Sequence, residues 1–283
     1  WTYGTDGALI SAPDFERFDL EKKDCGLKPV AVDSCGGMVF VNLDPRGPAA
    51  PLRAWIGEDI ASQMDTTVVA RATHFSEYVY DIDANWKLTY DNFQENYHLR
   101  FIHTKSGSAG LGPENPFGYP VRYGFHGLHR TQTIWSNPAP VVTPLQGYTF
   151  GLAARQQIAA GVDFGDNSNQ YFVLFPSLFI FASPVNPFTH MVYPISATRS
   201  RGVIRVYWIG ADDSAAKRFA REYGLAMTRD IHSEDRAVIE AGQRGLSSGA
   251  LSHIHFQEQE VLCRHLMHSV ASQVEAYKAE INA

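Results

Sequence analysis

The residues of this sequence best suited to hold a metal ion are two histidines five positions apart, His98 and His103. Neutral imidazole is a common ligand of iron and zinc. On an ideal helix, side chains five positions apart point about 140° away from each other, so the rings can meet at one ion only if the helix ends or bulges between them. Asp91 and Glu95 fall within about 60° of His98 on a helical wheel, where carboxylates can orient an imidazole or raise its basicity. The same acids can equally form a solvated helix face.

A carboxylate that can complete such a site, Asp235, stands 132 positions after His103. It heads the apolar stripe Ile239, Gly242 and Leu246 of a predicted helix, and a carboxylate directed at a core is costly unless it is paired or binds a metal. Alternatively, Asp235 caps or charges the N-terminus of that helix. Two histidines and one carboxylate are the ligand set of non-haem Fe(II) oxygenases. A zinc hydrolase can use the same residues, but the HExxH motif of zinc proteases is absent.

Both strands and helices are predicted around these residues. Hydrophobic periodicity predicts strands over 171–175, 178–183, 190–195 and 202–210, and helices over 51–64, 85–98, 214–232, 233–246 and 257–281. A stretch rich in Gly and Pro, 106–147, is expected to be a loop. The predicted fold class is therefore α+β, with a mostly antiparallel sheet and C-terminal helices.

Composition limits the classes of protein that this chain can belong to. Its 283 residues include 24 basic and 30 acidic ones, and 45% are hydrophobic, which indicates a substantial core. The net charge of −6 and the lack of a basic run argue against a nucleic-acid partner. No apolar run approaches the roughly 18 residues of a membrane span. Cys25, Cys35 and Cys263 lack the spacing of a zinc or disulfide framework, so we expect a globular protein of the cytoplasm.

The order Asp91-Asn92-x-x-Glu95-x-Tyr97-His98-x4-His103, followed by Glu234-Asp235 and Gln243-Arg244-Gly245-Leu246, resembles the catalytic domain of the Rieske non-haem iron oxygenases. This family includes the large (alpha) oxygenase subunits of aromatic-ring-hydroxylating dioxygenases, and several monooxygenases and demethylases. Trp1-Thr2-Tyr3 is similar to the residues that follow the second Cys-x-x-His of the family's Rieske centre. The run from Gly36 to Leu43 is similar to the final strand of that domain. The resemblance implies a Rieske-domain remnant over 1–47, a linker over 48–64 and a helix-grip (START-like) catalytic domain over 65–283.

The resemblance also implies a reaction and its partners. His98, His103 and Asp235 would bind mononuclear Fe(II), which activates O2 to hydroxylate or dihydroxylate an aromatic or other apolar substrate. The ligands of the [2Fe–2S] cluster would lie before Trp1, so the cluster is expected only in a longer protein. Electrons would come from NAD(P)H through a separate reductase or ferredoxin, and the subunits would form a homotrimer, with or without a small beta subunit.

Two further residues receive roles from the resemblance. Glu95 would bridge His98 to a Rieske histidine of the neighbouring subunit, and Asp91 would orient an imidazole or pass electrons and protons. The family commonly has Asp where this chain has Glu95. In having Glu at this position, the chain resembles the branch of the family that acts on quaternary amines such as carnitine. A quaternary-ammonium monooxygenase or demethylase is therefore an alternative function.

Aromatic residues between Phe117 and Phe181 can line an apolar cavity or form the core of the sheet. Such a cavity suits an aromatic substrate by stacking and a trimethylammonium group by cation–π attraction. A function from another class is a non-catalytic helix-grip module that binds a lipid or sterol, which would need neither iron nor a buried Asp235.

Overall fold

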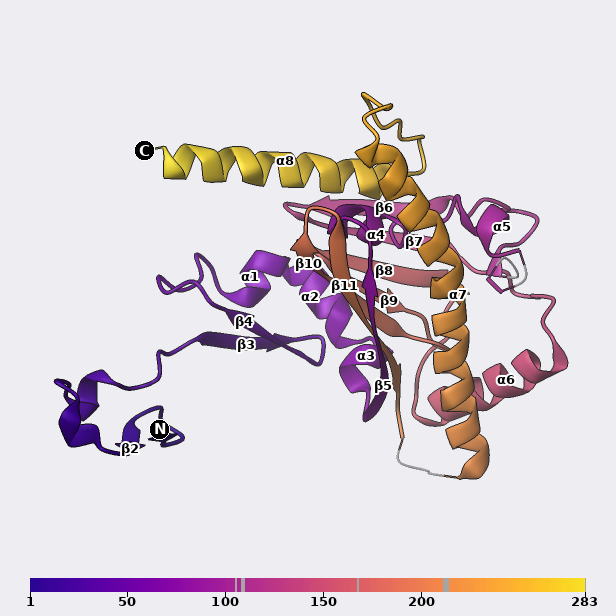
Figure 1. The fold of residues 1–283 in the computed structure, drawn as a ribbon. Helices are drawn as coiled ribbons and strands as arrows, with labels where there is room; N and C mark the ends of the chain where they lie inside the picture. The colour runs from indigo at the N-terminus through magenta and orange to yellow at the C-terminus, as the bar shows by residue number, and fades with distance from the viewer. Residues whose placement is uncertain (105, 108–109, 167, 211–213, 283) are drawn as a thin grey trace.

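The centre of the molecule is an antiparallel sheet of seven strands in the order β5-β11-β10-β9-β8-β7-β6 (Figure 1). The computed structural model describes residues 1–104, 106–107, 110–166, 168–210 and 214–282. The strands are β5 (His74–Ile82), β6 (Pro120–His126), β7 (His129–Trp135), β8 (Ser168–Leu174), β9 (Leu178–Ala182), β10 (Phe188–Ser196) and β11 (Arg199–Trp208). The α+β fold class expected from the sequence is confirmed.

Alternating side chains of the central strands enter two different cores. Phe172 and Leu174 of β8 pack on one face against α1 (Leu52–Ile56) and α2 (Glu58–Asp65). Val173 packs on the other face, which is covered by α4 (Trp86–Asp91), α7 (Ala215–Ser247) and α8 (Val261–Ile281). This alternation is the period-2 geometry of a strand whose two faces are both buried. The remaining helices are α3 (Val68–Arg71), α5 (Leu99–Ile102) and α6 (Pro144–Ala159).

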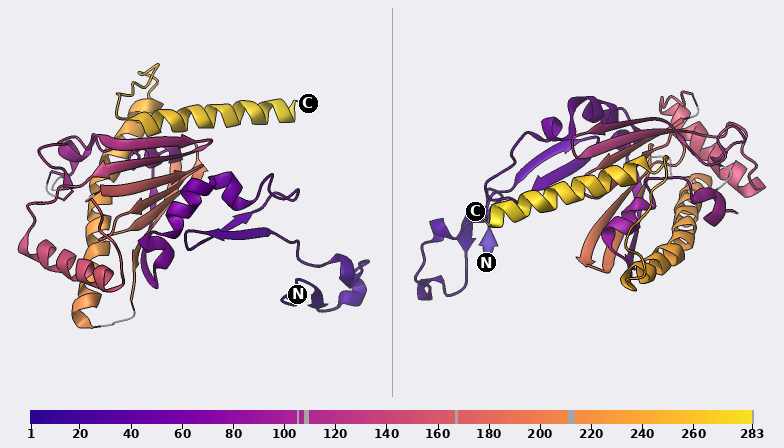
Figure 2. Two further views of the ribbon diagram at one scale, coloured as in Figure 1. Left: turned by 180° about the vertical axis from the view of Figure 1, so that it is seen from behind. Right: turned by 90° about the horizontal axis from the view of Figure 1, so that it is seen from above.

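The N-terminal part of the chain forms two small sheets that are separate from the main one. These are β1 (Thr2–Tyr3) with β2 (Leu9–Ser11), and β3 (Ala31–Cys35) with β4 (Met38–Asn42), joined through the short 3-10 helices η1 (Phe15–Arg17) and η2 (Lys22–Asp24). In all views the segment with β1 and β2 lies apart from the main sheet, and the β3–β4 hairpin connects it to the rest (Figure 2).

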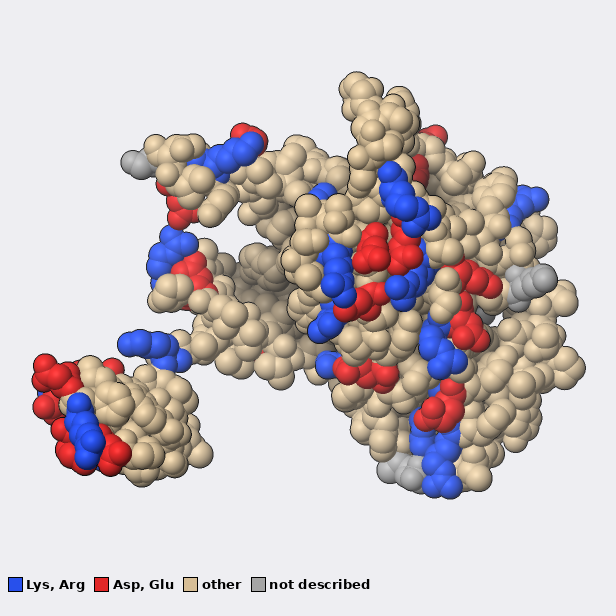
Figure 3. Space-filling model, viewed as in Figure 1, with Lys and Arg blue, Asp and Glu red and all other residues tan. Residues whose placement is uncertain are grey.

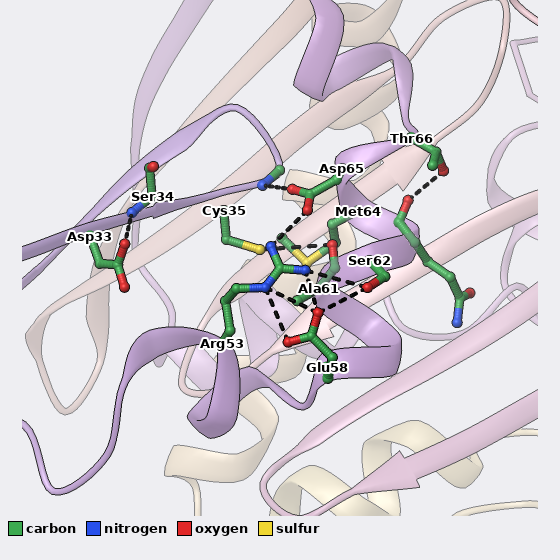
Figure 4. Close-up of polar contacts among 12 residues, drawn as sticks. Asp33, Ser34, Cys35, Arg53, Glu58, Ala61, Ser62, Met64, Asp65 and Thr66 are labelled. Atoms are coloured by element: carbon green, nitrogen blue, oxygen red, sulfur yellow. Dashed lines mark hydrogen bonds and ion pairs between the residues drawn. The ribbon is translucent and has the colours of Figure 1, made fainter.

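Polar contacts and one buried thiol attach the β3–β4 hairpin to α2 (Figure 4). The backbone N–H of Gly36, in the hairpin turn, donates to Asp65 Oδ1 over 2.8 Å. Arg53 in turn lies 2.7 Å from the Asp65 carboxylate and 2.7 Å from that of Glu58. Cys35 is buried among the apolar residues of α1 and α2. The turn therefore fixes the hairpin to the helices.

Several expectations about secondary structure are wrong. The two helices predicted over 214–232 and 233–246 are one helix, α7, of 33 residues. Ser233 does not interrupt it, because its hydroxyl donates to the Arg229 carbonyl of the preceding turn. The predicted loop over 106–147 contains the hairpin β6–β7 and the start of α6, and β6 is an edge strand, where Pro120 is tolerated. The helix predicted over 51–64 is divided at Gly57, whose φ is 95°.

The face of the molecule seen in Figure 3 carries charges of both signs close together. Pairs across β5 and β11, such as Arg201 with Asp81 at 2.7 Å and Arg205 with Glu77 at 2.8 Å, are typical of this pattern. Among the described residues, no helix is both long and apolar enough to cross a bilayer.

Candidate metal centre

His98 and His103 stand on either side of a single helical turn, α5. The helix predicted over 85–98 is interrupted, because α4 ends at Asp91 and His98 begins a new turn as the N-cap of α5. The carboxylate of Glu95 accepts hydrogen bonds from the backbone N–H groups of Tyr97 and His98, and such local bonds compete with a continuous helix. As a result the two imidazole rings meet with their centroids 5.2 Å apart.

Asp235 reaches the same point from the middle of α7, far from the N-terminus of that helix, so it is not a helix cap. Its carboxylate is buried, with 3% of the side chain exposed. Asp235 Oδ1 lies 2.8 Å from His103 Nε2 and 3.4 Å from His98 Nε2. One ligand atom of each residue lies within 4.8 Å of the others. Segments more than 130 positions apart in the sequence thus form one cluster of metal-ligand type.

The hydrogen-bonding state of these atoms fits a metal ion. Within the described part of the chain, His103 Nε2 and Asp235 Oδ1 are buried, and neither makes a hydrogen bond of acceptable geometry, although they face each other. A cation bound between them would satisfy both atoms. Two imidazole nitrogens and one carboxylate oxygen, on one side of the ion, are the donor set of mononuclear non-haem iron.

A carboxylate holds the Nδ1 atom of each histidine. Glu95 Oε1 lies against His98 Nδ1, and Glu234 Oε2 lies 2.7 Å from His103 Nδ1 and also accepts from the Ser106 hydroxyl. This arrangement turns both Nε2 atoms toward Asp235 and fixes which nitrogen of each ring can bind a metal. Glu234 was not assigned a role from the sequence, where the only signal was its position next to Asp235.

The charges around the triad shift its pKa values strongly. Burial alone would lower the pKa of His98, but the carboxylates of Asp235 and Glu95 raise it to about 9. The pKa of His103 is also raised, because Asp235 and Glu234 outweigh its burial. Burial would raise the pKa of Asp235, whereas the two histidines lower it to about 2. Without a metal ion, the site therefore favours an imidazolium beside a carboxylate.

Asp91 lies in a different buried network. Its carboxylate accepts a hydrogen bond from Gln94 Nε2 over 3.0 Å, and Gln94 Oε1 accepts from Arg130 Nε over 2.6 Å. Arg130 is fully buried on β7, and burial raises the pKa of Asp91 well above its usual range. The hydrogen bonds of the two imidazoles go to Glu95 and Glu234, whereas Asp91 is joined to Gln94.

Only some of the aromatic residues that the sequence suggests for a cavity lie together: Phe175, Phe179 and Phe181 belong to one core cluster that also contains Phe93. Phe172 packs in the core on the α1–α2 face, and Tyr119 and Phe125 are 46% and 47% exposed. The rings that surround His232, one helical turn before Asp235, are instead Tyr78, Tyr80, Phe93 and His190. No local sequence pattern predicts this group, since its members come from four different elements or turns.

Comparison with known proteins identifies the family. Residues 69–276 match the family described as the ring hydroxylating alpha subunit (catalytic domain). The chain belongs to this family. The match contains His98, His103 and Asp235, and the seven-stranded sheet with its C-terminal helices is the fold of this catalytic domain. Through this family the chain is related to the Rieske-type oxygenases, which are oxidoreductases.

Individual relatives match this chain over limited lengths. The glycine betaine monooxygenase oxygenase subunit of Chromohalobacter salexigens is 37% identical over 105 residues, which are 36% of this chain and 22% of that protein. The 2-aminobenzenesulfonate 2,3-dioxygenase alpha subunit of an Alcaligenes species is 32% identical over 115 residues, which are 39% of this chain and 28% of that protein. The solved structure of a quaternary ammonium Rieske monooxygenase superposes with a TM-score of 0.73 at 18% identity, over 96% of this chain and 70% of that one.

Proposed function

We propose that this chain is the catalytic part of an oxygenase that oxidises a small organic substrate with O2 at one Fe(II) ion bound by His98, His103 and Asp235. The observation that carries the proposal is the buried pair His103 Nε2 and Asp235 Oδ1, which lie 2.8 Å apart without a proper hydrogen bond. When bound, the iron would supply the site at which O2 is reduced and the substrate oxidised.

The chain's own residues would prepare the site for this chemistry. Glu95 and Glu234 accept hydrogen bonds from the Nδ1–H groups and so keep His98 and His103 in the tautomer that presents Nε2. Asp235 supplies the single negative charge that neutralises part of the charge of the cation. Asp91 would act on the site only indirectly, by fixing the end of α4 through Gln94.

Two substrate classes are candidates. An aromatic or other apolar substrate is favoured by the rings next to the triad, among them Phe93 and Tyr80. A quaternary-ammonium substrate is favoured by the presence of Glu95 and by the similarity to the glycine betaine monooxygenase subunit. In the second case the same ring faces would attract a trimethylammonium group.

The supply of electrons and the assembly are also part of the proposal. We infer that residues 1–47 belong to a Rieske [2Fe–2S] domain, 48–64 to a linker and 65–283 to the catalytic domain, and that the cluster ligands lie outside this sequence. A cytoplasmic reductase or ferredoxin would deliver electrons to that cluster. In a homotrimer, with or without a beta subunit, Glu95 would link His98 to the cluster of the neighbouring subunit.

Iron analysis of the purified chain tests the proposal. We expect about one iron per chain and no acid-labile sulfide, because the described residues contain one such triad and none of the three cysteines replaces the cluster ligands. His103→Ala should lose nearly all iron and keep its circular dichroism spectrum. His253→Ala, which changes an exposed histidine, is the matched control and should keep full iron. Full iron in His103→Ala would mean that the metal lies elsewhere.

A further inference from the structure

Five rings pack together on the face of the sheet that α7 covers. Tyr78 and Tyr80 come from β5, His190 from β10, Phe93 from the turn after α4 and His232 from α7. The ring centroids of Tyr80 and His232 are 3.8 Å apart, and those of Phe93 and His190 are 4.1 Å apart. His232 lies three residues before Asp235 on α7, so the cluster begins one helical turn from the metal triad.

The position of Tyr80 depends on a glycine in the neighbouring strand. Tyr80 of β5 is paired with Gly202 of the adjacent strand β11. The tyrosine ring lies over Gly202, and its hydroxyl is 2.6 Å from His190 Nε2 on β10, the strand beyond β11. A Cβ atom on residue 202 would lie 2.1 Å from the Tyr80 ring. The strands therefore leave space for one defined position of the tyrosine, with its hydroxyl against an imidazole.

Several polar atoms of this cluster have no partner. Among the described residues, neither ring nitrogen of His232 makes a hydrogen bond, and His190 Nδ1 makes none either. His232 is 1% exposed and His190 is fully buried, so bulk water does not reach them. A buried hydrogen-bonding group without a partner typically costs about 1–3 kcal/mol. A ring with two such atoms, one turn from the triad, indicates that a bound molecule supplies the missing partners.

We propose that His232 binds the substrate by hydrogen bonds to an uncharged polar group, and that the Tyr80–His190 pair helps to hold the same group. The proposal rests on the function proposed above and specifies the substrate class, an aromatic or apolar molecule with one hydroxyl, carbonyl or ring nitrogen near the carbon that is oxidised. Burial lowers the pKa of His232 to about 4, so at neutral pH its ring has one donor and one acceptor. The Tyr80–His190 pair likewise leaves one donor and one acceptor free, whichever of the two groups donates to the other.

A quaternary ammonium head would not satisfy these atoms. A trimethylammonium group has neither a donor nor an acceptor, so it would contact the ring faces and leave the nitrogens of His232 unpaired. The two candidate substrate classes therefore make different predictions for this one side chain.

Three probes with the same benzyl body separate the two cases: benzyl alcohol, ethylbenzene and benzyltrimethylammonium. Their binding to the anaerobic, iron-loaded chain is measured by titration calorimetry. We expect benzyl alcohol to bind about fivefold or more tightly than ethylbenzene, the gain of a buried hydrogen bond. His232→Phe keeps a ring beside Tyr80 and should abolish this difference, and His232→Gln, which restores a donor and an acceptor, should recover part of it. Tyr80→Phe should reduce the difference.

His265→Phe is the matched control, because His265 is a partly buried histidine of α8 that stacks on Phe125 and should leave the probe preference unchanged. An unchanged preference for benzyl alcohol in His232→Phe would overturn the proposal. So would tighter binding of benzyltrimethylammonium than of benzyl alcohol, or no binding of benzyl alcohol at millimolar concentration. Iron content is measured on the same samples: a wild-type chain without iron contradicts the proposed function, whereas full iron without a probe preference contradicts only the role of His232.

Discussion

Glu234 is the residue whose contribution to the metal centre can be isolated most cleanly. Its side chain contacts the triad through His103 Nδ1, at 2.7 Å, and Glu234 is not in the ligand cluster that the described residues form. Removing the partner of a ligand histidine typically weakens metal binding by about 10- to 100-fold. We therefore expect Glu234→Ala to lower the affinity for Fe(II) by about this factor, as measured by competition with a chelator.

Glu240→Ala provides the comparison, since Glu240 lies on the same helix but bonds to Arg236, over 2.9 Å. Its iron affinity should equal that of the wild-type chain. Equal affinity in both variants would show that the contact between Glu234 and His103 does not support the metal.

At the scale of elements, attachment of the β3–β4 hairpin depends on the close approach of its turn to α3. Gly37 has a φ of 73°, and a Cβ atom at this position would lie 2.7 Å from Ala70 Cα. Gly47 has a similar φ of 80° but no atom within 4 Å of such a Cβ. Alanine at either position adds the backbone strain of the left-handed region, about 1–2 kcal/mol, and only Gly37→Ala adds a collision with backbone.

We expect the free energy of unfolding of Gly37→Ala, measured with urea, to be about 1–3 kcal/mol lower than that of Gly47→Ala. The thiol of Cys35, which is 3% exposed, should also become reactive toward a thiol reagent in the first variant only. Equal stability and equal labelling in the two variants would mean that the turn can move away from α3 at no cost.

The elements also show what can be inferred from a sequence of this kind. The meeting of His98, His103 and Asp235 could be expected, because few residue types bind metals and a buried carboxylate needs a partner. The interruption of the helix before His98 could not, since it involves hydrogen bonds from the backbone N–H groups of Tyr97 and His98 to the Glu95 carboxylate. The hairpin β6–β7 could not be predicted either, because its glycines and Pro120 are typical of a loop.

The cluster around His232 is the clearest example of information that periodicity does not contain. Tyr80 and His190 are 110 positions apart, and their contact exists only because β5 and β10 flank β11 in the sheet and residue 202 has no side chain. Strand order and register are properties of the folded sheet. The residues next to Tyr80 and His190 in the sequence therefore could not predict that these two side chains lie near the triad.

At the scale of the whole molecule, the stability of the metal-free protein should depend on pH more strongly than that of the metal-loaded protein. In the metal-free chain the pKa of His98 is raised from 6.5 to about 9. This shift stabilises the fold fully below about pH 6.5, and the stabilisation is lost as the pH rises through 9. Iron binds the neutral imidazole, so its stabilising effect should grow over the same range, as protons cease to compete.

Urea unfolding at pH 6 to 9 checks this prediction. The free energy of unfolding of the metal-free chain should fall with pH, and the difference between iron-loaded and metal-free chains should increase. His98→Gln should reduce the slope of the metal-free chain, and His103, whose pKa is also raised, should account for the slope that remains. A metal-free stability that is independent of pH in this range would contradict the close contact of His98 with Asp235 and Glu95.

The continuity of α7 has a consequence for changes in chain length. One helix carries His232, Glu234 and Asp235, and each added residue turns a helix by about 100°. If one residue is inserted into α7 or deleted from it before His232, all three side chains therefore turn away from the site together. The same change in a loop alters only the connection between two elements. This helix should accept substitutions at many positions and length changes at almost none.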